Sequence, residues 1–151
     1  MKVGVVMLQC GLPHLTQMCV DSLHRSCKIP FEIILVENGS PDEESRQLAK
    51  QLVREKKVHW LVELKENVGY LLGNNRGIEF MMKLVDENKE ITHILLANND
   101  VLFSKMSVER MVAAIDSDPR MALVSPMYNA GGYQNQIYPL PPEITEAVMR
   151  E

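Results

Sequence analysis

Two amides and a carboxylate, Asn98, Asn99 and Asp100, end an apolar run that begins at Thr92. Short apolar runs without turn residues are typical of strands buried on both faces of a parallel sheet. Ligands of such sheets bind beyond the carboxyl ends of the strands. An aspartate at that place can hold a divalent cation and, through it, phosphate oxygens, because hard cations prefer oxygen ligands. The same residues also suit a turn or a helix cap, since Asn and Asp are favoured in both.

Polar residues also follow two earlier apolar runs. Gln9 opens the first polar stretch, which extends to Gly11, and Glu37 and Asn38 open the second, which extends to Ser40. In a parallel sheet, the crevice outside the carboxyl ends of the strands gathers such residues at a switch point in the strand order. We therefore predict that these side chains share one site with those of residues 98–100.

Three glycines, Gly69, Gly73 and Gly77, recur every fourth residue, with Asn74 and Arg76 among the residues between them. This spacing places the glycines on one face of a helix. One interpretation is close packing of the helix, because a glycine with no packing or ligand role weakens a helix by about 1 kcal/mol relative to alanine. The other interpretation is ligand binding, since free N–H groups at a helix start attract anions and an arginine adds a planar fork for phosphate.

The elements that must position these residues alternate between strand and helix patterns. Strands are predicted over 2–8, 31–36, 58–64, 92–100 and 121–125, and helices around 15–23, over 43–55, from about 69 through 85, and around 108–115. The third helix is marked by a stripe of Leu71, Asn75, Ile78, Met82 and Val85. Such alternation predicts an α/β fold, a Rossmann-like three-layer α/β/α arrangement with a mainly parallel central sheet and right-handed crossovers.

Composition narrows the class of protein. The chain has 151 residues, enough for one domain with a sizeable core, and its net charge of −4 argues against a nucleic-acid partner. Its apolar runs are too short to span a membrane. The three cysteines are odd in number and form no CxxC motif, so a reducing cytoplasm is expected. The phosphate-binding glycine motifs of dinucleotide-binding and P-loop proteins are absent.

Four segments in order, 3–7, 31–42, 66–79 and 95–100, resemble the successive motifs of family 2 glycosyltransferases, and most closely those of the rhamnosyltransferase-like branch. The resemblance extends from about Val3 to Met127. It implies a GT-A fold, a nucleotide-sugar donor (a UDP-, dTDP- or GDP-sugar) and Mg²⁺ or Mn²⁺ as the cofactor.

The resemblance also assigns roles to individual residues. Asn98-Asn99-Asp100 stands at the family's DxD position, so Asp100 would hold the metal and the diphosphate, and the Asn98 amide would bond a ribose hydroxyl. Glu37 stands at the position, usually Asp, that accepts a hydrogen bond from the nucleobase. The predicted donor site therefore comprises Gln9, Glu37, Asn38, Gly69, Gly73, Asn74, Arg76, Asn98 and Asn99, with Asp100 as the metal ligand.

The resulting prediction is an inverting glycosyltransferase in which residues 1–127 form the nucleotide-sugar-binding core. Residues 128–151 are expected to form a loop and a short helix leading toward a missing acceptor-binding half. The resemblance places the catalytic base in that half, so no catalytic residue is predicted. The acceptor would be a saccharide or lipid-linked, and a bare apolar edge predicts a homo-oligomer or a partner chain.

Two other functions are weighed against this one. The first is a non-catalytic nucleotide-sugar-binding or scaffold module. The second is a flavodoxin-like regulator, which is disfavoured because the first strand lacks an acidic phospho-acceptor pair and the 67–77 motif would be unexplained.

Overall fold

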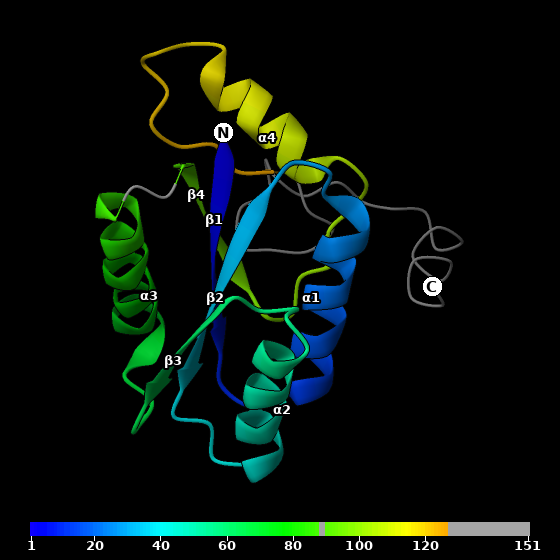
Figure 1. Ribbon diagram of the computed structural model, residues 1–151, viewed down its shortest axis with the longest axis vertical. Helices are drawn as coiled ribbons and strands as arrows, with labels where there is room; N and C mark the ends of the chain where they lie inside the picture. Colours follow the sequence, from blue (N-terminus) through cyan, green and yellow to red (C-terminus); the bar gives the residue numbers. More distant parts are fainter. Residues whose placement is uncertain (88–89, 127–151) are drawn as a thin grey trace, which may run out of the picture. The chain divides into compact units, whose positions relative to one another are not determined.

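The computed structural model describes residues 1–87 and 90–126 (Figure 1). The chain divides into two compact units, Met1–Glu109 and Arg110–Glu151, each of which is described by itself. The loop and short helix predicted over residues 128–151 lie outside the described residues.

Helices and strands alternate along the described chain, as the sequence predicts. In chain order they are β1 (Lys2–Gln9), α1 (Pro13–Ser26), β2 (Phe31–Asn38), α2 (Glu43–Arg54), β3 (Trp60–Leu64), α3 (Gly69–Asp86), β4 (Ile91–Asn98) and α4 (Ser107–Asp116). The four strands form one parallel sheet in the order β3-β2-β1-β4. Helix α3 covers one face of the sheet and helices α1 and α2 cover the other (Figure 1). This arrangement confirms the predicted three-layer α/β fold.

The core lies around the two central strands. All but the first residue of β1 and of β2 are buried, as expected for strands covered by helices on both faces. On the α3 side, Val6, Ile34 and Val36 pack with Met81 and Leu84 of the helix. The two strands that end in Gln9 and Asn38 are therefore the most buried part of the sheet.

Strand β4 is not buried on both faces, and that part of the prediction is wrong. Its residues alternate in exposure, and the side chains of Ile94 and Leu96 are 42% and 46% exposed. The register places them beside Gly4 and Val6 of β1, on the face that α3 covers. Helix α3, however, packs over β1 and β2, so the edge strand projects beyond it.

The predicted fifth strand over residues 121–125 is also absent from the described part of the chain. Residues 121–126 form neither helix nor strand, and the side chain of Leu123 is 86% exposed. Strand propensity is largely a property of packing and pairing, so a suitable sequence does not make a strand by itself.

Only part of the apolar stripe that predicts α3 lies on the buried face of the helix. Leu71 and Met82 of the stripe are 70% and 46% exposed, whereas Gly73, Gly77 and Met81 are buried. A Cβ added at Gly77 would lie 2.3 Å from Cγ1 of Val6. The helix therefore approaches the sheet through its small residues, which confirms the packing interpretation for Gly73 and Gly77.

Candidate active site

The carboxyl ends of β1, β2 and β4 meet at one edge of the sheet. Gln9 of β1 pairs in register with Glu37 of β2, and Leu8 of β1 pairs with Asn98 of β4. Three predicted site residues that are far apart in the chain thus come from adjacent strand ends. The structure brings them together at the edge outside which ligands of parallel sheets bind.

Asp100 and Asn98 are the exposed polar residues at the end of β4. Within residues 1–87 and 90–126, neither side chain makes a hydrogen bond or an ion pair with the protein. The thiol of Cys19 lies behind them and donates to the Asn98 carbonyl at 3.4 Å. Burial, together with the negative charge of Asp100, raises the pKa of Cys19 to about 12, so this thiol is neutral. The Asp100 carboxylate is therefore the open anionic group of this edge.

Asn99, between these two residues, has a different role in the structure. Its Nδ2 donates to Thr16 Oγ1 at 2.9 Å and to the Gly11 carbonyl at 3.4 Å. The end of β4 is thereby tied to the loop that follows β1. In that loop Gly11 and Leu12 both have positive φ, 74° and 55°, and the Leu12 side chain is exposed. A leucine in the left-handed region is strained, and such strain persists where the surroundings hold it in place.

Glu37 closes the turn after β2. Its side chain is 2% exposed, and Oε1 accepts a hydrogen bond from the Ser40 backbone N–H at 2.7 Å. Ser40 Oγ in turn accepts from the Gly11 N–H at 2.9 Å, which joins this turn to the loop after β1. A carboxylate has about four acceptor positions, so Glu37 retains acceptor capacity beyond this bond. Ser40 belongs to the predicted polar stretch, whereas Thr16 is a site-shaping residue that the sequence analysis missed, since its partner Asn99 lies far along the chain.

Gln9 lies beneath the same edge. It is fully buried, and its Nε2 donates to the Ser45 carbonyl at the start of α2 at 2.8 Å. Its Oε1 has no partner among the described residues. The neighbouring Cys10 is exposed, and partial burial with the charges of Glu37 and Asp42 raises the pKa of its thiol. A raised pKa disfavours the thiolate, so Cys10 is poorly suited to be a nucleophile.

The start of α3 is held by Asn38 of β2. The Oδ1 of Asn38 accepts from the Val68 N–H at 3.1 Å, and its Nδ2 donates to Asn67 Oδ1 at 3.1 Å and to the Gly69 carbonyl at 3.3 Å. The first turn of α3 contains no acidic residue and no side-chain cap. Its positive amino end is therefore not neutralised locally.

The remaining α3 residues of the predicted site differ in placement. Gly69, with φ of +83°, has open space where a side chain would be, whereas a Cβ on Gly73 would lie 2.6 Å from Leu8 Cδ1. Asn74 is buried and its Nδ2 donates to the Tyr70 carbonyl at 2.9 Å. Arg76 is exposed, forms an ion pair with Glu79 at 2.9 Å, and lies about 10 Å along the axis from the helix start. The structure does not bring Arg76 to the strand ends.

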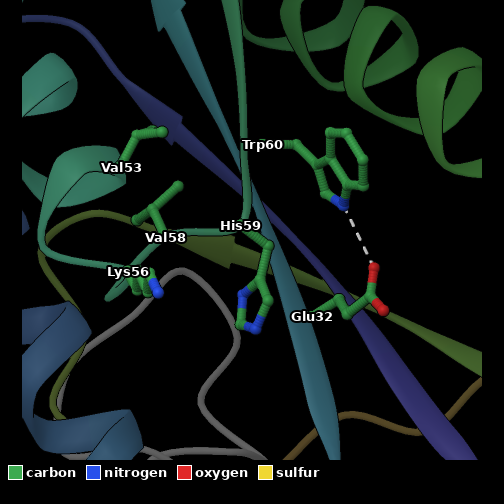
Figure 2. Close-up of a pocket in the computed structure, with 6 residues that line it drawn as sticks. All are labelled: Glu32, Val53, Lys56, Val58, His59 and Trp60. Atoms are coloured by element: carbon green, nitrogen blue, oxygen red, sulfur yellow. Dashed lines mark hydrogen bonds between the residues drawn. The ribbon is translucent and has the colours of Figure 1, made fainter.

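A cavity of about 380 Å³ lies at the opposite end of the sheet, at the amino ends of β2 and β3. It is lined by Glu32, Val53, Lys56, Val58, His59 and Trp60 (Figure 2). Glu32 accepts from Trp60 Nε1 at 3.0 Å and pairs with Lys2 at 2.8 Å. Burial raises its pKa, but these two donors outweigh that effect and lower the pKa overall. None of the predicted site residues lines this cavity, so it is not the predicted site.

Comparison with known proteins agrees with the observed fold. The sequence description of glycosyl transferase family 2 matches residues 4–146, which is most of the chain. The chain therefore belongs to glycosyl transferase family 2. Among curated proteins, no sequence matches it significantly.

Solved structures with the same fold include those of S. aureus TarS. The crystal structure of TarS 1–349 superposes with a TM-score of 0.59 at 20% identity, over 78% of this chain and 33% of TarS 1–349. The complex of TarS 1–349 with UDP-GlcNAc gives 0.60 at 17% identity, over 86% and 39%. The complex with UDP gives 0.59 at 17% identity, over 86% and 40%. The chain thus spans between a third and two fifths of these proteins, and the likeness establishes the fold.

Within the described ranges, no three His, Cys, Asp or Glu side chains come close enough together to hold a metal ion by themselves. In the same part of the chain, no helix is both long and apolar enough to cross a membrane.

Proposed function

We propose that this chain binds a nucleotide-sugar donor together with Mg²⁺ or Mn²⁺ at the carboxyl edge of its sheet, for inverting glycosyl transfer. The observation that carries the proposal is the Asp100 carboxylate, which is exposed at the end of β4 beside Asn98 and has no partner among the described residues. Membership of glycosyl transferase family 2 supports the proposal. So does the shared fold of TarS, which has been crystallised with UDP and with UDP-GlcNAc.

The donor set at this edge fits a cation that is shared with a ligand. Mg²⁺ typically keeps several waters and is held by one or two carboxylates together with substrate phosphates. One open carboxylate, Asp100, with the Asn98 amide nearby meets that need, whereas an all-protein cage is not available in residues 1–87 and 90–126. When bound, the cation would supply Lewis-acid stabilisation of the diphosphate leaving group.

The protein residues around the cation would position the rest of the donor. Glu37, which faces the same edge, would accept a hydrogen bond from the imide of uracil or thymine. Asn98 would bond the ribose, and the open backbone at Gly69 would lie near the phosphates. The rhamnosyltransferase-like branch, a saccharide or lipid-linked acceptor, and an acceptor-binding part that supplies the base belong to the same proposal.

Removing the Asp100 carboxylate tests the proposal. For wild type and Asp100→Ala, we would measure calorimetric affinities for UDP, dTDP and GDP with and without Mn²⁺. We expect wild type to bind more tightly with Mn²⁺, and Asp100→Ala to lose that gain while its stability changes by no more than about 0.5 kcal/mol. Asp86→Ala, which removes an exposed carboxylate at the far end of α3, is the matched control. An Mn²⁺-dependent gain of the same size in wild type and Asp100→Ala would refute the proposal.

A further inference from the structure

The side chain of Asn38 is occupied entirely by the segment that begins α3. It is 2% exposed, and its three hydrogen bonds, of 3.1 to 3.3 Å, go to Asn67, Val68 and Gly69. Both the amide oxygen and the amide nitrogen are used. This leaves Asn38 little capacity to bond a ligand, although the sequence pattern predicts it as a donor-binding residue.

Close packing also leaves little room around the Asn38 side chain. Gly39 has φ of +62°, and a Cβ there would lie 2.2 Å from the carbonyl carbon of Glu66. A Cβ on Gly73 would lie 3.2 Å from Asn38 Nδ2. The Asn38 amide is therefore held between the first turns of α3 and the loop before it, and the neighbouring backbones touch.

Asn67 extends this arrangement in two directions. Its Oδ1, which accepts from Asn38, also accepts from the Gly69 N–H at 2.8 Å. Its Nδ2 donates to Cys10 Sγ after β1 at 3.3 Å. The ends of β1 and β2 are thus connected to the start of α3 through these two asparagines.

We propose that Asn38 is a positioning residue for the nucleotide site: through its hydrogen bonds to Asn67, Val68 and Gly69 it sets the start of α3 against the strand ends, and it does not touch the donor. This inference rests on the proposed function for its ligand. The N-cap residue of α3, Val68, makes no side-chain cap bond, and the amides at the helix start are satisfied instead by Asn38 and Asn67.

The test compares Asn38→Asp, Asn38→Ala, Asn67→Ala and the double alanine variant. In Asn38→Asp, an oxygen replaces the amide nitrogen and faces two acceptors, the Gly69 carbonyl and Asn67 Oδ1. We expect UDP binding to weaken roughly tenfold with and without Mn²⁺ alike, because the loss of a buried hydrogen bond is worth about that factor. The gain from Mn²⁺ itself should persist, since Asp100 is unchanged. Asn75→Ala, an exposed asparagine of the same helix, is the control.

The alanine pair separates positioning from direct contact. Because the two asparagines hold the same start of α3 and bond each other, the double variant should lose less UDP affinity than the product of the two single losses. Losses that multiply, or Asn38 variants that bind as wild type does, would overturn the inference. A wild type that binds no UDP would instead refute the proposed function.

Hydrogen exchange at the Val68 amide tests the hydrogen bond from Val68 to Asn38 without a ligand. Asn38→Ala removes the Oδ1 that accepts from this amide, so its exchange should be faster than any loss of global stability accounts for; exchange no faster than that would overturn the inference.

Discussion

Substituting Gly77 with alanine tests how closely α3 must approach the sheet. The new Cβ would lie 2.3 Å from Val6 Cγ1 and 2.9 Å from Val36 Cγ2. Carbon atoms prefer separations of about 3.5 to 4.0 Å, so a displacement of about 1 Å is required. Both valines are fully buried in the central strands, and their branched side chains have few alternative rotamers. The helix rather than the sheet is therefore expected to move.

Two opposing effects determine how much stability Gly77→Ala loses. Replacing glycine by alanine within a helix favours folding by about 1 kcal/mol. Overpacking a well-filled core costs about 1 to 3 kcal/mol, and the short distances here place the cost at the upper end. The expected net loss is about 2 kcal/mol, or about 4 to 8 °C in Tm for a chain of this size.

Urea unfolding followed by circular dichroism measures this loss. The control is Asn75→Ala, which lies on the exposed side of α3 and gains helix propensity without a clash. If Gly77→Ala were as stable as Asn75→Ala, the close packing of α3 through its glycines would be refuted.

Two further predictions concern Glu37 and His59. Glu37→Gln keeps an oxygen for the Ser40 N–H but turns an amide donor toward the proposed nucleobase. Stability should therefore change little, while the UDP affinity measured by calorimetry should fall. Unchanged affinity would rule out recognition of the nucleobase by Glu37. His59 accepts the Ile33 N–H on Nδ1 at 3.0 Å, and partial burial of its ring lowers its pKa despite the opposing charge of Glu32. The His59 side chain therefore binds a proton more readily in the unfolded chain than in the folded one. The free energy of unfolding should be highest above about pH 7 and should decline as the pH falls through the lowered pKa of the folded state. Urea titrations should show that His59→Gln removes this decline, and an unchanged pH profile would contradict the assignment.

Much of the fold could be predicted because the alternation of strand and helix patterns is a local property of the chain. Parallel strands place their carboxyl ends at one edge, so the meeting of Gln9, Glu37 and Asn98 follows from that pattern. The sequence pattern did not predict that β4 would be partly exposed or that residues 121–125 would form no strand. Whether a strand is paired and covered depends on where other elements lie, and a short apolar run does not encode this.

The sequence by itself determined the α/β class, the parallel sheet, and the polar character of the strand ends that the donor site requires. Only the tertiary structure decided which of those polar groups are open and which are occupied. Asp100 is open, whereas Asn38 and Asn99 bond partners that lie 29 to 88 residues away in the chain. Even asparagines at the strand ends differ, since Asn98 is exposed whereas Asn38 and Asn99 are hydrogen-bonded, because a hydrogen bond depends on the position of a distant partner in three dimensions.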